Sequence, residues 1–461
     1  MKHAKKLASL LLVLVMVLSL ATAAFAAATP ETGSITINDA VVGQTYTAYQ
    51  ILDLESYNAS ANAYAYKATT AWNTFINSDS IKGTYVEVDS QGYVTWKNGA
   101  DAAAFAKAAQ KYAKDNSIAN QGSVTATTTT VSFTGLDLGY YLVDTTLGTL
   151  CSLNTTNPDV VMEEKNEVPT NVKTVEEDST GNYGEKNDAD IGQTVNFKST
   201  ITTQAGAENY VFHDTMSAGL TYTGVTGITL NGTAVDASNY TVVTEGLTDG
   251  CTFEVRFTQA FCDTLNANGQ IVISYTATLN ENAVIAGAGT PNTSKLSYGD
   301  SSNTKYTPDS QTKTYTWDFN IFKYTKNASG EEVALSGAKF KLSKDEAGTQ
   351  TISLIDITAE NATTKTYRVA KTGETGITEF EVGSDGKVVV QGLDADTYYL
   401  TETVAPAGYN KLAGAIKVTI DSEGNVKKDN DTDALVNKTL KVENKTGALL
   451  PSTGGMGTTI F

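Results

Sequence analysis

Apolar and polar residues alternate in short runs along much of the chain. Three of these runs enclose a turn rich in glycine, aspartate and serine: residues 84–96 (TYVEVDSQGYVTW), 380–390 (FEVGSDGKVVV) and 417–428 (KVTIDSEGNVKK). Alternation with a period of two around such turns is typical of β-hairpins, and many short strands of this kind indicate β-sandwiches. The pattern therefore predicts an all-β chain with a hairpin in each of these segments.

Helical periodicity is scarce by comparison. The best helical segment is residues 101–114 (DAAAFAKAAQKYAK), in which Phe105, Ala109 and Tyr112 fall on one face. Asp101 opens the segment, and aspartate is a preferred residue at the start of a helix because its side chain accepts from free backbone N–H groups. We expect this helix and otherwise only minor helical turns.

Two distant segments resemble each other: residues 131–145 (VSFTGLDLGYYLVDT) and 388–403 (VVVQGLDADTYYLTET). Each contains a strand, a Gly-Leu-Asp turn and a Tyr-Tyr-Leu strand that ends in an acid. In this alignment Asp144 takes the place of Glu402. The repeat predicts that two domains of the chain are copies of one sandwich type.

The first 26 residues have the pattern of a secretory signal peptide. Basic residues precede an apolar run at 10–18, and the small-residue pattern Ala24-Phe25-Ala26 follows. The apolar run is shorter than the about 20 residues that cross a bilayer as a helix. We therefore expect residues 1–26 to be removed and the rest of the chain to be secreted.

The remaining residues are too many for one hydrophobic core. Prolines and polar stretches indicate boundaries near residues 167 and 312. These predict an N-terminal sandwich at 27–167, a middle sandwich at 168–311, a third sandwich at 312–447, and a tail at 448–461.

The chain is strongly acidic. Its formal net charge of −18 becomes −21 when Lys2, Lys5 and Lys6 leave with the signal peptide. Such a chain repels nucleic acids and anionic surfaces. No nucleic-acid partner is expected.

Few residues of the mature chain could support enzymatic chemistry. The cysteines are Cys151, Cys251 and Cys262, too sparse for a disulfide framework, although a Cys251–Cys262 bridge is an alternative. His213 is the remaining histidine, and its neighbour Asp214 faces the opposite side of a strand. No nucleophile elbow, metal-ligand spacing or phosphate loop is present. We expect no cofactor, no metal and a structural role, not an enzyme.

The third region contains polar residues within apolar strands. Lys323 lies in WDFNIFKYTK, Glu402 in TYYLTETVAPAGYN and Asn444 in LKVENKTG. Burial of charged groups is costly, and it favours the neutral amine of a lysine and the neutral acid of a carboxyl group. A neutral amine can attack the side-chain carbonyl of an asparagine, while a protonated acid donates a hydrogen bond to the amide oxygen. The product would be a Lys–Asn isopeptide bond with loss of ammonia.

The motifs FNIFKY, YYLTETVAPAGY and KVENK resemble the Lys, Glu and Asn motifs of the Cna B-type domain of Gram-positive surface proteins. GAKFKLSK at residues 337–344 fits the same family, so the resemblance spans the third domain. It implies immunoglobulin-like sandwiches, three in tandem along the chain. It also implies a self-catalysed bond between Lys323 and Asn444, with Glu402 as the acid.

The middle region looks like the middle domain of isopeptide-forming backbone pilins. NVKTVEED contains Lys173, NYVFHDTMSAGL contains Asp214, and AGAGTPNTSKLSY contains Asn292. The resemblance implies a Lys173–Asn292 bond with Asp214 as the acid. Spacing alone also allows Lys198 and Asn303.

The N-terminal region lacks one of these groups. Its first strand, GSITINDA at residues 33–40, contains no lysine. Without an amine no isopeptide bond forms, so none is expected there.

The tail contains a short motif, LPSTG, that resembles the LPXTG sorting signal of sortase substrates. Proline and small residues suit an extended segment that enters a narrow groove. The resemblance implies cleavage after the threonine and an acyl-enzyme at that residue. Such substrates continue into a membrane span, so we expect the sequence to be truncated. The motif consists of Leu450, Pro451, Ser452, Thr453 and Gly454.

In pilins of this kind, a lysine of the next subunit resolves the acyl-enzyme, within a motif similar to YPK. Lys165 in VVMEEKNEVP is the matching position, but Glu163 and Glu164 replace the Tyr-Pro pair. Lys173 is the nearest alternative.

These features predict a backbone subunit of a cell-wall-anchored pilus. Its expected partners are a pilin-type sortase and identical subunits in a covalent fibre, with minor pilins and host surface ligands as further candidates. The alternative is a monomeric sortase-anchored adhesin whose N-terminal domain binds a host ligand. A surface hydrolase that depends on His213 is a more distant alternative.

Overall fold

Strands make up 52% and helices 8% of the computed structural model. It describes residues 26–27, 32–58, 63–144, 149–154, 157–163, 168–204, 207–299 and 304–447. The chain divides into two compact units, which are Met1–Val168 with Gln204–Ala207, and Pro169–Thr203 with Glu208–Phe461. The predicted class, all-β sandwiches with minor helices, is confirmed. No helix among the described residues is long and apolar enough to cross a membrane.

The first unit contains two sheets within its described residues. Its strands are β1 (Ala26–Ala27), β2 (Thr32–Asn38), β3 (Thr45–Asn58), β4 (Ala63–Ala68), β5 (Val86–Val88), β6 (Tyr93–Trp96), β7 (Gly122–Thr125), β8 (Thr130–Asp137), β9 (Gly139–Asp144), β10 (Thr149–Leu153) and β11 (Asp159–Glu163). The larger sheet has the order β10-β9-β3-β4-β6-β5, with β1 and β7 also on β3, and the smaller has the order β11-β2-β8. The predicted hairpin at residues 84–96 is formed by β5 and β6.

Helices accompany the larger sheet of the first unit. The predicted helix is α2 (Ala102–Asp115), and the Asp101 carboxylate accepts from the backbone N–H of Ala103 at 2.9 Å. Two short elements, η2 (Thr70–Trp72) and α1 (Asn73–Ile76), were not predicted. Their aromatic side chains pack against α2, with the Trp72 and Tyr112 rings 5.5 Å apart.

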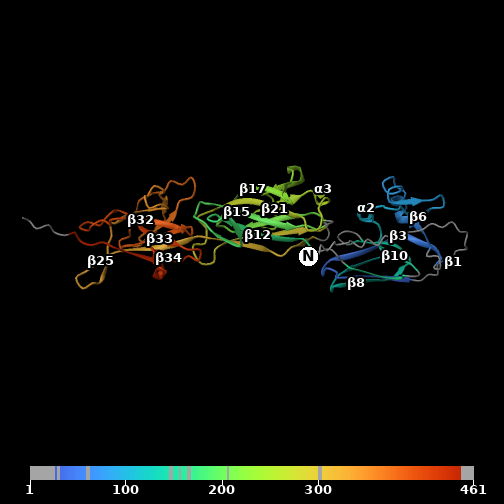
Figure 1. The fold of residues 1–461 in the computed structure, drawn as a ribbon, viewed down its shortest axis with the longest axis horizontal. Helices are drawn as coiled ribbons and strands as arrows, with labels where there is room; N and C mark the ends of the chain where they lie inside the picture. Colours follow the sequence, from blue (N-terminus) through green and yellow to red (C-terminus); the bar gives the residue numbers. More distant parts are fainter. Residues whose placement is uncertain are drawn as a thin grey trace, which may run out of the picture. The chain divides into compact units, whose positions relative to one another are not determined.

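The second unit begins with the middle sandwich. Its strands are β12 (Thr170–Glu177), β13 (Asn182–Gly184), β14 (Lys186–Asp188), β15 (Thr194–Thr202), β16 (Val211–Met216), β17 (Leu220–Leu230), β18 (Thr233–Ala234), β19 (Tyr240–Val243), β20 (Phe253–Phe257), β21 (Gln270–Leu279), β22 (Thr290–Tyr298), β23 (Lys305–Tyr306) and β24 (Ser310–Tyr315). One sheet has the order β13-β12-β15-β21-β17-β18, and β12, β15, β21 and β17 are labelled in Figure 1. The facing sheet has the order β14-β24-β22-β16-β20-β19, with β23 on β22. The short helices are η3 (Ala237–Asn239) and α3 (Gln259–Cys262).

The third sandwich follows in the same unit. Its strands are β25 (Trp317–Lys326), β26 (Glu332–Ala334), β27 (Lys339–Ser343), β28 (Leu354–Asp356), β29 (Lys365–Val369), β30 (Phe380–Glu381), β31 (Lys387–Leu393), β32 (Thr397–Val404), β33 (Ile416–Ile420), β34 (Val426–Lys428) and β35 (Thr439–Glu443), with the helical turn η4 (Val436–Lys438). One sheet has the order β26-β25-β31-β29-β28, with β35 on β25, and the other has the order β30-β27-β32-β33-β34.

Of the two hairpins predicted in the third domain, one forms and one does not. β33 and β34 pair as predicted for residues 417–428. The prediction for 380–390 is wrong, because β30 pairs with β27 in one sheet and β31 pairs with β25 in the other. The turn between them carries the chain across the sandwich. Alternation around a turn identifies two strands, but it does not say which partner each strand takes.

The middle and third sandwiches contact each other within the second unit. The Trp317 indole N–H donates to Asp188 Oδ1 at 2.5 Å, and the backbone N–H of Ile191 donates to the carbonyl of Gly392 at 2.9 Å. Gly392 has a φ of +83°, and a Cβ there would lie 2.6 Å from the Ile191 side chain. Ile191 packs into the core of the third sandwich. The domain limits themselves remain predictions; β24 crosses the one at residue 311 and pairs with β22.

Candidate functional site

Three polar side chains meet inside the third sandwich. Lys323 lies on β25, and Asn444 directly follows β35, the parallel neighbour of β25. The backbone N–H of Asn444 donates to the carbonyl of Tyr324 at 3.0 Å, which continues the strand pairing past β35. Glu402 lies on β32 in the opposite sheet. The amine and the amide therefore come from adjacent strands, and the acid reaches them across the interior.

The Glu402 carboxyl group bridges the other two side chains. Its Oε1 lies 3.1 Å from Lys323 Nζ, and its Oε2 accepts from Asn444 Nδ2 at 3.1 Å. The backbone N–H of Leu412 also donates to Oε2 at 2.8 Å. The side chains of Lys323 and Glu402 have no solvent-accessible surface. Removal from water lowers the pKa of Lys323, and the nearby Glu402 opposes this shift.

The orientation of the Asn444 amide follows from its second contact. Nδ2 donates to the carbonyl of Asn410 at 2.5 Å, and a carbonyl can only accept, so the NH₂ group must face it. Among the described residues, Asn444 Oδ1 has no hydrogen-bond partner. The sequence analysis predicted a contact from the acid to the amide oxygen. In the structure Glu402 instead contacts the amide nitrogen.

A second polar set lies inside the middle sandwich. Lys173 is on β12 in one sheet, whereas Asp214 and Asn292 are on the adjacent strands β16 and β22 of the facing sheet. All three are almost fully buried, with exposed fractions of 1% or less. Lys173 Nζ donates to Asp214 Oδ2, and both side chains are inaccessible to solvent.

Sequence reasoning missed a fourth member of this set, Tyr275 on β21. Its hydroxyl donates to Asp214 Oδ2 at 2.5 Å and also accepts from Lys173 Nζ. The Lys173 amine lies 5.1 Å from the centre of the Phe197 ring, so aromatic side chains cover it. Tyr275 sits within an ordinary alternating strand, QIVISYTATL, and nothing in that pattern distinguishes it from a core tyrosine.

Burial dominates the electrostatics of the middle set. It lowers the pKa of Lys173 and raises the pKa of Asp214, and the attraction between the two groups opposes both shifts. Burial and the neighbouring Asp214 raise the pKa of Tyr275 well above its usual value. Neither polar atom of Asn292 makes a hydrogen bond with the described residues, although the amide is close enough to lower the pKa values of Asp214 and Tyr275.

The structure separates Lys198, one sequence alternative, from this set. Lys198 is half-buried on β15, and its amine lies 3.7 Å from the centre of the Tyr183 ring. The other alternative, Asn303, lies outside the described residues.

The first unit has no comparable set among its described residues. Asp144, predicted to take the place of Glu402, does not do so, because its carboxylate accepts from Gln110 of α2 at 2.6 Å. The two repeated segments do share one contact: the Tyr141 and Tyr398 hydroxyls each donate to the carbonyl of the aspartate four residues earlier. Asp144 follows its tyrosine by three residues, whereas Glu402 follows its tyrosine by four. The odd spacing turns Asp144 to the helix-covered face.

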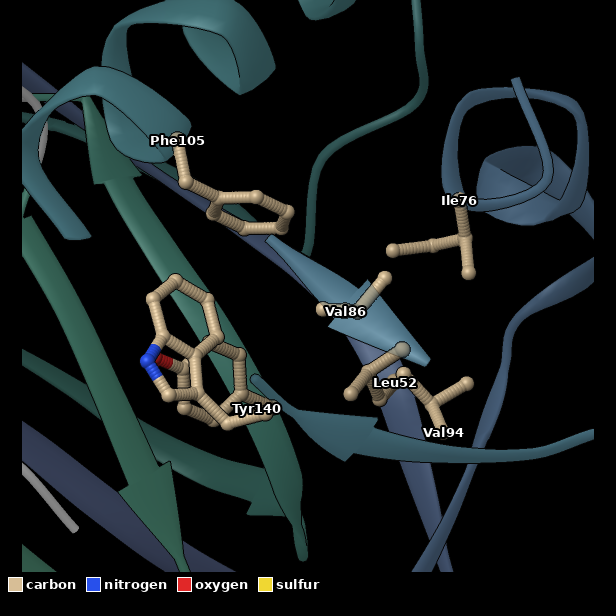
Figure 2. A pocket seen from close by; sticks show the side chains of 7 residues that line it. Leu52, Ile76, Val86, Val94, Phe105 and Tyr140 are labelled. Carbon is tan, nitrogen blue, oxygen red and sulfur yellow. The ribbon is translucent and has the colours of Figure 1, made fainter. Parts of the chain in front are cut away.

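A pocket in the first unit is lined by aliphatic and aromatic side chains (Figure 2). Phe105 of α2 and Val86 of β5 contribute to it, and none of the lining side chains carries a carboxylate, an amine or an imidazole. The complete lining is Leu52, Ile76, Val86, Val94, Trp96, Phe105 and Tyr140.

Several predicted features lie outside the described residues. They are residues 1–25 of the predicted signal peptide, whose last residue Ala26 lies in β1, the linkage lysine Lys165, and the sorting motif from Leu450 to Gly454. The described cysteines are free and buried, so the alternative of a Cys251–Cys262 bridge is wrong.

Comparison with sequence families gives matches in both sandwiches of the second unit. Residues 191–302 match the family described as Gram-positive pilin backbone subunit 2, Cna-B-like domain. Residues 320–435 match the SpaA family, described as a prealbumin-like fold domain. This chain therefore carries a Cna-B-like domain of the Gram-positive pilin backbone family and a prealbumin-like domain of the SpaA family. Each matched segment encloses part of one buried set: Asp214 and Asn292 in the first, Lys323 and Glu402 in the second.

One solved structure supports the fold. The T6 backbone pilin of serotype M6 Streptococcus pyogenes, described as modular and three-domain, aligns with a TM-score of 0.52 at 14% identity, covering 86% of this chain and 81% of the pilin. The full-length major pilin SpaD from Corynebacterium diphtheriae aligns with a TM-score of 0.44 at 16% identity, covering 91% and 98%. No curated protein sequence matches this chain.

Proposed function

We propose that this chain is the structural backbone subunit of a sortase-assembled pilus, stiffened by two self-catalysed isopeptide bonds. The observation that carries the proposal is the same in two backbone-pilin domains. In each, a lysine with a lowered pKa lies beside a carboxyl group and an asparagine within a solvent-free interior. An uncompensated buried lysine is costly, and conversion to an amide removes both the charge and the cost.

In the third domain, the neutral Lys323 amine attacks Cγ of Asn444. A new N–C bond forms, the Cγ–Nδ2 bond breaks, and ammonia leaves. Glu402 contacts both nitrogens, at 3.1 Å each. One of its oxygens takes a proton from the attacking amine, and the carboxyl group returns a proton to the departing nitrogen. Its protonation state is therefore the same before and after the reaction.

In the middle domain, Lys173 attacks Cγ of Asn292 by the same chemistry, and Asp214 carries the proton. The two Asn292 polar atoms have no competing hydrogen bond among the described residues. Tyr275 contacts both the amine and the acid. We assign it a positioning role, because its hydroxyl holds Asp214 Oδ2 beside the amine.

Polymerisation would join Thr453 of one subunit to Lys165 of the next. Support comes from the sorting motif and from the position of Lys165 near the end of the predicted first domain. The subunit would be secreted and anchored to the cell wall, with a pilin-type sortase and identical subunits as partners and minor pilins as further ones. Tension along such a fibre would pass through Asn444 and Lys323, on adjacent strands of one sheet.

Incubation with a pilin-type sortase tests the linkage. The full-length protein should form a ladder of covalent multimers, and Lys165→Ala should abolish it. The matched control is Lys82→Ala, an exposed lysine of the first unit, which should keep the ladder. A ladder that persists in Lys165→Ala would refute this linkage site. Release of monomers carrying an added small amine, without multimers, would instead support the monomeric adhesin.

A further inference from the structure

Four potential metal ligands gather at the edge of the middle sandwich, away from the buried lysine. His213 of β16 lies directly opposite Glu254 of β20 in the antiparallel pairing. The loop before β20 adds Asp249 and Cys251, and it is tied to β16 by a 2.6 Å hydrogen bond from the Thr252 N–H to the Asp214 carbonyl. The four ligand atoms lie within 4.8 Å of one another. His213 and Asp214 face opposite sides of β16, as alternation along a strand requires.

The ligand atoms converge on one point. His213 Nδ1 is 2.9 Å from Asp249 Oδ2 and 3.3 Å from Glu254 Oε1. Cys251 Sγ is 3.9 Å from the same Glu254 oxygen. His213, Cys251 and Glu254 are each at least 91% buried, whereas Asp249 is partly exposed and leaves a path from solvent.

Hydrogen bonds around the cluster fix the orientation of the imidazole. Ser297 Oγ lies 2.9 Å from His213 Nε2 and donates its own proton to the carbonyl of Val211 at 3.4 Å. Which of the two atoms, Oγ or Nε2, donates to the other depends on the tautomer of His213. His213 Nδ1 faces two carboxylate oxygens, Asp249 Oδ2 and Glu254 Oε1. In the tautomer with its proton on Nε2, the Nδ1 lone pair repels both anionic oxygens unless a cation lies between them.

Hydrogen bonds also orient the two carboxylates of the cluster. Glu254 Oε2 accepts from Arg256 Nε at 2.6 Å, and Asp249 Oδ1 accepts from the backbone N–H of Cys251 at 3.1 Å. Each acid thus has one oxygen held by a hydrogen bond, from the Arg256 side chain or from the Cys251 backbone, and its other oxygen lies among the ligand atoms. Outer partners that orient the ligands are a regular feature of protein metal sites.

We propose that His213 Nδ1, Asp249 Oδ2, Cys251 Sγ and Glu254 Oε1 bind one Zn²⁺ ion. A set of imidazole, thiolate and carboxylate ligands suits zinc, whereas Ca²⁺ and Mg²⁺ prefer oxygen ligands alone. Four protein ligands make a closed, structural site. Tetrahedral ligands of zinc are about 3.5 Å apart, so side-chain rotations of about an ångström complete the geometry. Binding replaces the Cys251 S–H proton with the metal, and that proton passes to solvent.

Such an ion would cross-link the loop at residues 244–252 to β16 and β20, close to one edge of the sheet. The edge strand is β19, which pairs with β20 and has no other neighbour in the described part of this sheet. The ion would stabilise the face of β16 opposite Asp214. The metal site is independent of the proposed isopeptide chemistry, which uses Asp214 on the inward face of β16.

Titration of the untagged, chelator-treated protein with Co²⁺ tests the site. We expect one equivalent to bind and to give both the visible bands of tetrahedral Co²⁺ and the near-ultraviolet charge-transfer band of a thiolate–cobalt bond. Zn²⁺ should displace the Co²⁺, release one proton per site and protect Cys251 from alkylation. Cys251→Ser should abolish the charge-transfer band, and Asp249→Asn should weaken binding at least tenfold.

Cys262→Ala is the matched control, because Cys262 is also a buried free cysteine and lies on α3 outside the cluster. It should keep the full titration. Asp249 is partly exposed, so its asparagine variant is expected to fold and to isolate the loss of a ligand. Absence of saturable binding in the wild-type protein would overturn the proposal. Unchanged spectra in Cys251→Ser would overturn it as well.

Discussion

The buried sets of the middle and third domains each bring a lysine, a carboxyl group and an asparagine together, but from different strand arrangements. In the third domain the lysine and asparagine come from adjacent parallel strands, β25 and β35, and the acid comes from the facing sheet. In the middle domain the acid and asparagine share a sheet, and the lysine comes from the facing one. A bond in the third domain would therefore tie two strands of one sheet. A bond in the middle domain would tie one sheet to the other.

The supporting contacts differ as well. Glu402 is held by the backbone N–H of Leu412, whereas Asp214 is held by the hydroxyl of Tyr275. A backbone N–H does not depend on the identity of a side chain, and its position is fixed by the fold. A tyrosine can be substituted, which gives the middle domain a contact that mutation can remove. If both sets form the proposed bonds, the reaction requires a buried amine, acid and amide but no particular strand order around them.

The largest predicted effect is the loss of a cross-link. Lys323→Met should remove one ammonia loss from the intact mass. It should also lower the free energy of unfolding of the third domain by about 5 kcal/mol, the chain-entropy value for a closed loop of about 100 residues. Thermal unfolding with mass spectrometry measures both. Lys326→Met, an exposed lysine of the same strand, should change neither.

The middle domain gives the parallel test. Lys173→Met should remove the other ammonia loss with a similar destabilisation, because its loop is of comparable length. Lys198→Met is the informative control, since Lys198 was the alternative amine in the sequence. A mass shift that disappears in Lys198→Met but persists in Lys173→Met would reverse the assignment.

A smaller effect is expected for Tyr275→Phe. Loss of one hydrogen bond to a buried charged group costs about 1.5–3 kcal/mol, so formation of the middle-domain bond should slow at least tenfold. Fragments analysed shortly after expression should show an incomplete middle-domain bond. The third-domain bond in the same molecules is the internal control. Equal completion of both bonds in this variant would show that Tyr275 has no positioning role.

The smallest effect concerns the contact between the two sandwiches. Burial, reinforced by the neighbouring Asp190, raises the pKa of Asp394 to about 8, and burial raises the pKa of Asp188 to about 6. Both acids bind a proton more tightly in the folded chain. Their contribution to stability is therefore fully present below the pKa of an unfolded aspartate and is lost as the pH rises through these values. Lys344 offsets part of this effect for Asp394.

The unfolding temperature should accordingly fall by a few degrees between pH 5 and pH 9. Asp394→Asn should flatten this dependence, whereas Asp433→Asn, at an exposed position, should leave it unchanged. A stability that rises over the same range would contradict the assignment.

The sequence predicted the strands better than their partners. Local alternation identified the hairpins at 84–96 and 417–428, and an N-terminal aspartate identified α2. The segment at 380–390 failed because the pattern is local, whereas its two strands pair in different sheets. Asp144 failed for a similar reason: one residue less between the tyrosine and the acid turns the carboxylate to the other face.

The site residues show the same limit. Lys323, Glu402 and Asn444 stood out because charged or polar residues interrupt apolar strands. Tyr275 did not, because a tyrosine is ordinary in a core strand. The group of His213, Asp249, Cys251 and Glu254 was invisible for another reason: cross-strand register brings together residues whose spacing resembles no metal motif.

The most direct test of the account is the intact mass of the mature protein. Two isopeptide bonds release two molecules of ammonia, so the mass should be about 34 Da below the value calculated from the sequence after signal removal. Proteolysis should then yield two branched peptides, one joining Lys173 to Asn292 and one joining Lys323 to Asn444. A mass equal to the calculated value, with all four residues recovered in linear peptides, would contradict the central claim.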